Sequence, residues 1–213
     1  GVVIAMVPAI LVSIYFFGLG ALRVIAVASL ACLFFEWVIQ KYIIKGPLTI
    51  NDGSALVAGV LLAFNVPANF PSWMLIIGAF VTIAIAKMSF GGLGKNPFNP
   101  ALVGRIFLLI SFPSSMAGSV WPIPRPIFGA ETITDAVTGP TSLGILKEGI
   151  KMGKTVPELI PEMPTYLMEF FGNQSGCAGE VSALALIIGG IYMLSRKIIT
   201  WHIPFAYLGS VFI

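Results

Sequence analysis

Two short segments of this sequence combine residue types that could hold a ligand, and the first lies in a polar stretch of the chain. Residues 135–144 read Asp-Ala-Val-Thr-Gly-Pro-Thr-Ser-Leu-Gly. A hydroxyl becomes a nucleophile when a neighbouring base activates it, but no His or Cys stands near this segment in the sequence. Local chemistry alone therefore predicts a turn that delivers Thr141 or Ser142 as the N-cap of a helix.

The second segment, residues 90–100, reads Phe-Gly-Gly-Leu-Gly-Lys-Asn-Pro-Phe-Asn-Pro between two apolar runs. Its glycines and prolines interrupt a helix, and irregular backbone at membrane depth is tolerated only where protein or a cavity satisfies its polar groups. In one interpretation Asn96 and Asn99 supply amide donors and acceptors to a ligand. In the other, Asn99 caps the next helix and Pro100 takes its first position. The residues alone leave both interpretations open.

Membrane helices must position these segments, because the composition excludes a water-soluble globule. Hydrophobic residues make up 57% of the 213 residues and charged residues 10%, against roughly 25% charged residues in soluble domains. The net charge of +3 comes from scattered basic residues, which excludes nucleic acid as a partner. Cys32 and Cys177 lie far apart and predict neither a disulfide framework nor a metal site.

Apolar runs divide the chain into three parts. Residues 1–112 and 177–213 are predicted to form transmembrane helices, and residues 113–176 an external cap. Nearly uncharged runs cover 2–22, 24–39, 73–86 and 181–194, while 54–66 and 101–112 are short enough for half-helices. The chain begins without Met and ends inside an apolar run, so we expect it to be part of a longer membrane protein.

The basic residues predict which helix ends share a side of the membrane, since short cytoplasmic loops carry an excess of Lys and Arg. If every run crosses, one side receives Lys41, Lys45, Lys87, Lys95, Arg196 and Lys197. Residues 113–176 then lie outside with four basic and six acidic residues, a charge of −2 against +5 for the rest of the chain. Arg23, in a predicted outer turn, is the exception.

The predicted external cap is more than a passive connector. It contains eight prolines, is too polar for lipid, and is longer than an ordinary loop. Within it, residues 143–152 are predicted to form a helix and residues 166–171 to lie along the membrane interface.

Residues 135–141 of this cap resemble a known flavinylation motif, Asp-x-x-Ser/Thr-Gly-Ala-Thr, whose last Thr carries FMN through a phosphoester bond. Residues 91–105 and 176–185 are similar to the same family, as are Gly-Gly-x-Tyr at 189–192 and Trp-x-Ile-Pro at 201–204. That family is the D subunit of the Rnf ion-translocating ferredoxin:NAD oxidoreductase. It is paralogous to the B subunit of the sodium-pumping NADH:quinone reductase, and the compact cap favours the Rnf branch.

The resemblance implies that Thr141 carries FMN covalently. Asp135 and Thr138 would be recognition or positioning residues, and Gly139 would allow close approach of the flavin phosphate. Pro140 departs from the Ala that the family usually has at this position. Its fixed φ could hamper the transferase that attaches FMN.

The resemblance also implies a second flavin, a non-covalent riboflavin, near the break at residues 90–100, with Asn96 and Asn99 as ring contacts. The implied fold is an all-α polytopic bundle with broken or half helices, similar to urea and ammonium transporters. A metal site and a catalytic side chain are not implied.

The function implied by the resemblance is that of a membrane subunit of a redox-driven ion pump. Electrons would pass through the flavins during ferredoxin:NAD⁺ electron transfer while Na⁺ or H⁺ crosses a bacterial or archaeal cytoplasmic membrane. The partners would be other Rnf subunits, including flavin and iron–sulfur carriers. Ferredoxin and NAD would be handled elsewhere in the complex, so this chain alone would be inactive.

Two other functions are compatible with the residues. A small-solute channel or transporter is also built from broken helices, and a structural scaffold would need no cofactor. The flavinylation motif distinguishes the redox function from a solute pore, because a pore needs no modified external Thr. Among ionisable groups, Glu36 is predicted either to reach the membrane interface or to handle an ion, and Glu180 to lie at a helix start.

Overall fold

The structure, a computed structural model of the 213-residue chain, describes residues 1–45, 49–116, 122, 141–172, 175–180 and 182–212. The helices in these ranges are α1 (Val2–Val38), α2 (Ser54–Phe64), α3 (Ser72–Phe80), α4 (Pro100–Ser111), α5 (Pro113–Met116), α6 (Ser142–Lys151), α7 (Val156–Leu159), α8 (Tyr166–Phe171), α9 (Ala183–Ser195) and α10 (His202–Phe212). The described ranges contain no β-strand, so the predicted all-α class is confirmed for them.

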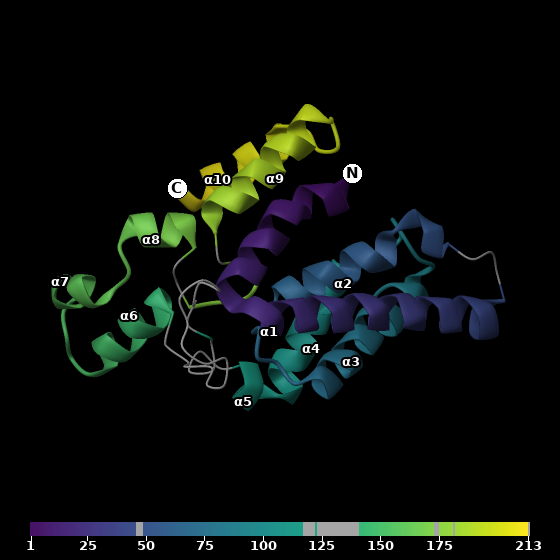
Figure 1. The fold of residues 1–213 in the computed structure, drawn as a ribbon, viewed down its shortest axis with the longest axis horizontal. Coiled ribbons are helices and arrows are strands. Elements are labelled where there is room, and N and C mark those ends of the chain that lie inside the picture. Colours follow the sequence, from purple (N-terminus) through teal and green to yellow (C-terminus); the bar gives the residue numbers. More distant parts are fainter. Residues whose placement is uncertain (46–48, 117–121, 123–140, 173–174, 181, 213) are drawn as a thin grey trace.

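Helix α1 is bent into two arms at Gly18, which has φ 58° and ψ −138°. This combination is accessible to glycine and strained for other residues. Figure 1 shows the two arms as a V, with the N-terminus at the end of the first arm. The sequence placed the turn at Arg23, and this prediction is wrong. Arg23 lies within the second arm, where its Nη2 donates a hydrogen bond to the Phe70 carbonyl at 3.1 Å.

The second arm of α1 packs with α2, α3 and α4 into a bundle (Figure 1). The arm continues through a π-helical segment, Ile39–Ile44, and α3 continues through another, Val81–Ile85. Two apolar helical stretches, Val2–Ile44 and Ser72–Phe90, have the length and composition to cross a membrane. Helices α2 and α4 have 11 and 12 residues, which confirms the two short runs expected from the sequence.

Small residues let the helices approach closely. A Cβ at position 59 of α2 would lie 2.7 Å from the Cα of Ser29 in the second arm of α1. Helix α9 packs on the first arm in the same way, because a Cβ at position 189 would overlap the Ala5 carbonyl. Such contacts between small residues are typical of membrane helices, which gain little from hydrophobic burial against one another.

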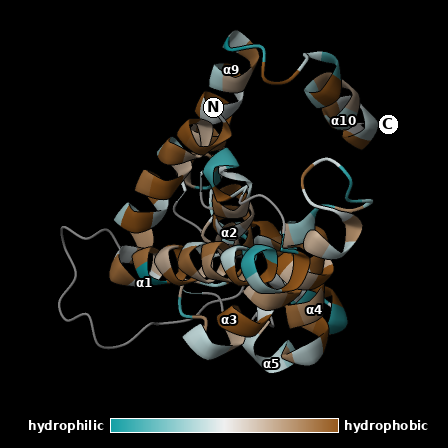
Figure 2. Ribbon diagram, turned by 90° about the vertical axis from the view of Figure 1, so that its right-hand side faces the viewer, coloured by the Kyte–Doolittle hydropathy of each residue, from teal (hydrophilic) through white to brown (hydrophobic). Residues whose placement is uncertain are grey.

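Apolar side chains face outward as well as inward in the helical part of the molecule. Figure 2 shows brown, hydrophobic colouring on most turns of α1, α3 and α9, with teal concentrated near helix ends. Leu11 and Leu30 of α1 and Ile110 of α4 are more than half exposed. A helix that is apolar on all sides is buried or faces lipid. These helices are therefore those of a membrane protein.

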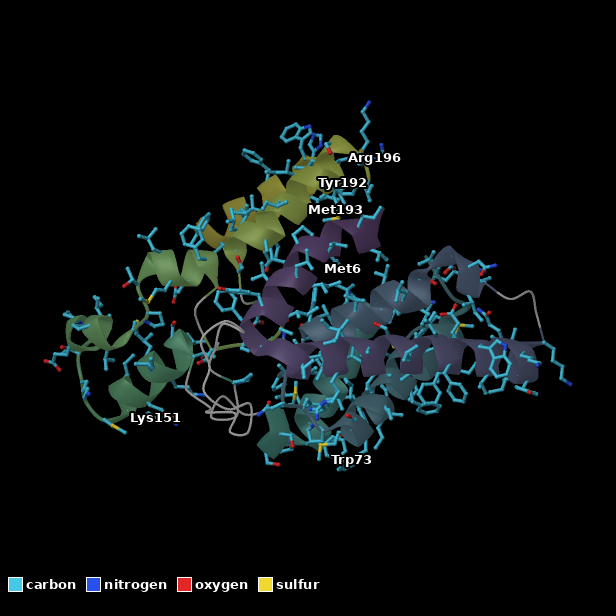
Figure 3. The ribbon with its side chains drawn as sticks, viewed as in Figure 1. Met6, Trp73, Lys151, Tyr192, Met193 and Arg196 are labelled. Carbon is cyan, nitrogen blue, oxygen red and sulfur yellow. The ribbon has the colours of Figure 1, made fainter. Side chains whose placement is uncertain are left out.

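Of the described helices in residues 113–176, the predicted cap, α5 contacts α4, while α6, α7 and α8 lie beyond one end of the bundle (Figure 1). Helix α6 confirms the helix predicted at 143–152, and α8 coincides with the predicted segment 166–171. Gly149 of α6 packs against Leu159 of α7, leaving no room for a larger residue at 149. Figure 3 shows Lys151 at the lower left and Arg196, which follows α9, at the top of the view.

Candidate functional site

Thr141 is the N-cap of α6. Its backbone is extended, with φ −71° and ψ 162°, and its Oγ1 accepts a hydrogen bond from the Gly144 N–H at 3.2 Å. The side chain is half-buried. The capping role that local chemistry predicted for this segment is confirmed, and it places the hydroxyl at the positive end of a ten-residue helix.

A second hydroxyl beside Thr141 links two cap helices. Ser142 Oγ donates a hydrogen bond to Glu169 Oε1 of α8 at 2.6 Å. Helix α7 is stabilised separately by a capping box between Thr155 and Glu158. The start of α6 is therefore fixed by its own cap and by a tether to α8.

The other residues of the flavinylation motif, Asp135, Thr138, Gly139 and the variant Pro140, lie outside the described residues. Their predicted roles stay predictions. Thr141 is the one motif residue whose surroundings the structure describes.

The second candidate segment begins where the π-helical end of α3 is followed by a short 3₁₀ turn, Met88–Phe90. Three glycines, Gly91, Gly92 and Gly94, then have φ between 81° and 96°. A Cβ at Gly92 or Gly94 would have no neighbour within 4 Å, so the backbone is open to an approaching group there. Such irregular backbone is tolerated beside a membrane helix because its polar groups bond within the segment.

Both asparagines of this segment have structural partners. Asn99 is the N-cap of α4, with Oδ1 accepting from the Ala101 N–H at 3.0 Å and Pro100 in the first turn. With its amide turned so that nitrogen donates, Asn96 bonds to the carbonyls of Lys87 at 3.1 Å and Gly92 at 2.9 Å. The capping interpretation of Asn99 is confirmed, while ring contact by either residue stays a prediction.

The surface beside these glycines is apolar and exposed. Phe90, Leu93 and Phe98 are 50%, 66% and 72% exposed, respectively. A flat aromatic ligand needs apolar faces for stacking and a few polar groups at its edge. The combination of exposed rings, open glycine backbone and two amides fits that requirement.

A buried charge network lies just before this segment, and the sequence reasoning missed it. Lys87 Nζ is 2.5 Å from Glu36 Oε2 and donates to Ser54 Oγ at 2.6 Å. The Glu36 and Lys87 side chains are 0% and 3% exposed. Gln40 Nε2 donates to Glu36 Oε1 at 3.1 Å, and Thr49 Oγ1 donates to the same oxygen at 3.3 Å.

The sequence assigned Lys87 to a loop as one of several basic residues on one side, and it placed Glu36 at the interface or on an ion path. The Glu36 carboxylate does not snorkel to water, because it is fully buried in the protein and paired with Lys87. The sequence did indicate that Glu36 needs a partner, because a charged carboxylate in an apolar run is costly unless a cation lies beside it. That signal did not identify which cation.

A second polar contact joins α2, α4 and the turn before α9. Arg105 Nη1 donates to Asn65 Oδ1 at 2.9 Å, and its Nη2 lies 4.0 Å from Glu180 Oε1. The sequence placed Glu180 at a helix start, but α9 begins at Ala183 with Ser182 as its N-cap. Glu180 instead belongs to the preceding turn, whose Gly179 N–H donates to the Phe64 carbonyl at 3.1 Å.

The described ranges form no metal centre from side chains alone. They hold no group of three or more His, Cys, Asp or Glu side chains arranged to bind a metal ion.

Comparison with known proteins matches one protein family over the whole chain. The model of the family described as "NQR2, RnfD, RnfE family" matches residues 1–213. The chain is 45% identical over 212 residues to the D subunit of the Na⁺-translocating ferredoxin:NAD⁺ oxidoreductase complex of Acetobacterium woodii, covering 99% of this chain and 61% of that protein.

Two further relatives agree. Identity is 39% over 211 residues with the D subunit of the proton-translocating ferredoxin:NAD⁺ oxidoreductase complex of Clostridium ljungdahlii, covering 99% of this chain and 61% of the relative. It is 37% over 223 residues with the D subunit of the ion-translocating oxidoreductase complex of Ectopseudomonas mendocina, covering 100% and 62%. The chain therefore spans about three fifths of the length of these relatives.

Proposed function

Because the chain belongs to the NQR2, RnfD, RnfE family, we propose that it is an electron-carrying membrane subunit of a redox-driven ion pump. Electron transfer from ferredoxin to NAD⁺ drives the pump, and the ion is Na⁺ or H⁺. The observation that carries this proposal is the family match over residues 1–213, with the three D-subunit relatives described above at 45%, 39% and 37% identity. The resemblance noted from the sequence is confirmed at the level of the family.

The first proposed cofactor is FMN joined to Thr141 through a phosphoester bond. In support, the Thr141 hydroxyl stands at the start of α6. The N–H groups and dipole of a helix N-terminus favour a phosphate there. Asp135, Thr138 and Gly139 would complete the recognition of this site. A flavin exchanges one or two electrons, and the protein sets its distance, hydrogen bonding and dielectric.

The second proposed cofactor is a non-covalent riboflavin at residues 90–100. Exposed Phe98 and Leu93 offer apolar contact, and the open backbone at Gly92 and Gly94 permits close approach. Asn99 uses its oxygen for capping, so its amide nitrogen is the group proposed to face the ring.

The proposed orientation puts the cap outside a bacterial or archaeal cytoplasmic membrane and the ends near Lys87 and Arg196 inside. The positive-inside rule supports it, and Lys151 and Arg196 lie well apart in the molecule (Figure 3). The proposed partners are the other subunits of an Rnf complex, including flavin and iron–sulfur carriers. Ferredoxin and NAD⁺ are handled by those subunits, so the isolated chain is expected to be inactive.

A small-solute channel of urea- or ammonium-transporter-like fold is the second candidate. The short helices α2 and α4 and the glycine break between α3 and α4 favour it, since such elements also line solute pores. It needs no flavin, and this difference makes the two candidates separable.

The test is mass spectrometry of the native protein from its own membranes. The proposed pump component carries the added mass of an FMN phosphoester on the peptide that contains Thr141, together with flavin fluorescence in a denaturing gel. An unmodified peptide from native membranes would contradict the covalent site and favour the solute channel.

A further inference from the structure

Lys87 is the residue at which the buried charge network and the glycine–asparagine segment meet. Its side chain contacts Glu36 and Ser54, as described above. Its backbone carbonyl accepts from the Gly92 N–H at 3.1 Å and from the Asn96 amide at 3.1 Å. Two hydrogen bonds that shape the segment therefore end on the main chain of the residue whose side chain is held by Glu36.

The position of Glu36 is itself well determined. Its Oε1 accepts from Gln40 and Thr49, which leaves Oε2 for the Lys87 ammonium. Gln40 and Thr49 are also hydrogen-bonded to each other through two contacts, one of them from the Thr49 N–H to Gln40 Oε1 at 2.9 Å. Carboxylate and ammonium both lie out of water, so neither moves without leaving a buried charge unpaired.

Two departures from regular helix flank this pair. Gln40 belongs to the π-helical segment Ile39–Ile44, and Lys87 follows the π-helical segment Val81–Ile85. Single π turns change the register of the side chains that follow, and they are frequent at functional sites. Here they lie on both chain segments that deliver the charges, one from α1 and one from α3.

We propose that Glu36 and Lys87 are positioning residues for the non-covalent flavin site at residues 90–100. The ion pair fixes the Lys87 carbonyl, and that carbonyl fixes Gly92 and Asn96. The inference rests on the proposed second flavin, and neither charge needs to contact the ring itself. The class of ligand positioned in this way is an isoalloxazine-bearing molecule without its own covalent tether.

The experiment uses the whole complex purified from membranes that carry Glu36→Gln, Glu36→Gln/Lys87→Met, or Lys87→Arg. Acid precipitation releases non-covalent flavin, which is quantified against the covalent FMN left on the protein, and the midpoint potential of the non-covalent flavin is measured by redox titration. Lys41→Met, which changes an exposed lysine at the same end of the bundle, is the matched control.

We expect Glu36→Gln to weaken retention of the non-covalent flavin by roughly tenfold, within the range for coupled residues in contact. Its midpoint potential should shift, and covalent FMN should stay unchanged. The double variant should show the same loss, because it restores charge balance but not the anchor. Lys87→Arg keeps a cation beside Glu36 and should retain the flavin.

Three outcomes would overturn the inference. Full flavin retention with an unchanged potential in Glu36→Gln and in the double variant would refute positioning while leaving the proposed function intact. Recovery of flavin in the double variant alone would assign the pair to folding only. Wild-type complex without any non-covalent flavin would overturn the second cofactor and this inference together.

Discussion

Gly104 of α4 packs directly against Thr82 of the π-helical segment that follows α3. A Cβ at position 104 would overlap the Thr82 hydroxyl, which already donates to the Gly78 carbonyl at 2.8 Å. This contact sets the distance between α4, which begins at Pro100 after its Asn99 cap, and the helix that leads to Lys87. The contact therefore fixes the distance between the two helices that flank the proposed riboflavin segment, residues 90–100.

Gly104→Ala should destabilise the folded protein by about 1–3 kcal/mol, the usual cost of overpacking a tight contact. Adding Thr82→Ala should recover part of this loss, since it removes the overlapped hydroxyl. Thermal unfolding in detergent, followed by tryptophan fluorescence, measures both. Gly190→Ala is the matched control, because a Cβ there has no neighbour within 4 Å. Equal effects of the two glycine substitutions would contradict the packing argument.

Two substitutions at Thr141 separate helix capping from flavin attachment. Thr141→Asn should keep the cap on α6, because Asn is among the preferred N-cap residues, whereas Thr141→Ala should cost about 0.5–2 kcal/mol. Both variants should lose covalent FMN on peptide mass spectrometry. Thr155→Ala, at the N-cap of α7, should retain it. Covalent flavin in Thr141→Asn would place the attachment at another residue.

Pro140→Ala restores the residue that the flavinylation motif usually has before its modified Thr. We expect this variant to carry at least as much covalent FMN as the native chain, since proline restricts the backbone that the transferase must accept. In-gel flavin fluorescence, normalised to protein, gives the ratio. A lower ratio would show that Pro140 assists attachment in this chain.

The buried pair makes a prediction about stability that is independent of flavin. Glu36→Gln alone should destabilise the protein by about 3–5 kcal/mol, because the Lys87 ammonium is left without its partner. Glu36→Gln/Lys87→Met should be more stable than Glu36→Gln in the same detergent unfolding assay. Glu148→Gln, which changes an exposed carboxylate of α6 away from the pair, serves as the control. A double variant less stable than the single one would contradict the desolvation argument.

Cys177 reports on the turn before α9. The side chain is fully buried, so maleimide should label it only after denaturation. Gly179→Ala should expose it to rapid labelling in the folded state, because a Cβ at 179 would lie 2.5 Å from the Phe64 Cβ and push the turn from α2. Cys32→Ala removes the other cysteine as a source of signal. Unchanged protection in Gly179→Ala would mean that the turn tolerates the added carbon.

Helix starts that depend on residues adjacent in the sequence were predictable. Asn99 with Pro100, and Thr141 before an apolar run, each carry the local signal of a helix start, and both helices begin there. The segment at 166–171 was found from its amphipathic residues, and it coincides with α8.

Contacts between residues far apart in the sequence were not predictable from local patterns. Lys87 pairs with a carboxylate 51 positions earlier, and no local pattern names that partner. The sequence analysis predicted the turn at Arg23 instead of Gly18 because Arg23 is the only charged residue in this apolar region, and a charge there favours a turn outside the membrane. Its guanidinium is instead satisfied by the Phe70 carbonyl, 47 positions later, which allows it to stay within the helix.

The bend at Gly18 also has a consequence for biosynthesis. The second arm of α1 meets α2 soon after it is made, but the first arm packs against Gly189 of α9, which is translated much later. At ordinary rates of synthesis this is a delay of roughly ten to forty seconds. During that interval the first arm lacks its contact with Gly189. Because Gly18 separates the two arms of α1, the second arm can pack with α2, α3 and α4 before the first arm packs against α9.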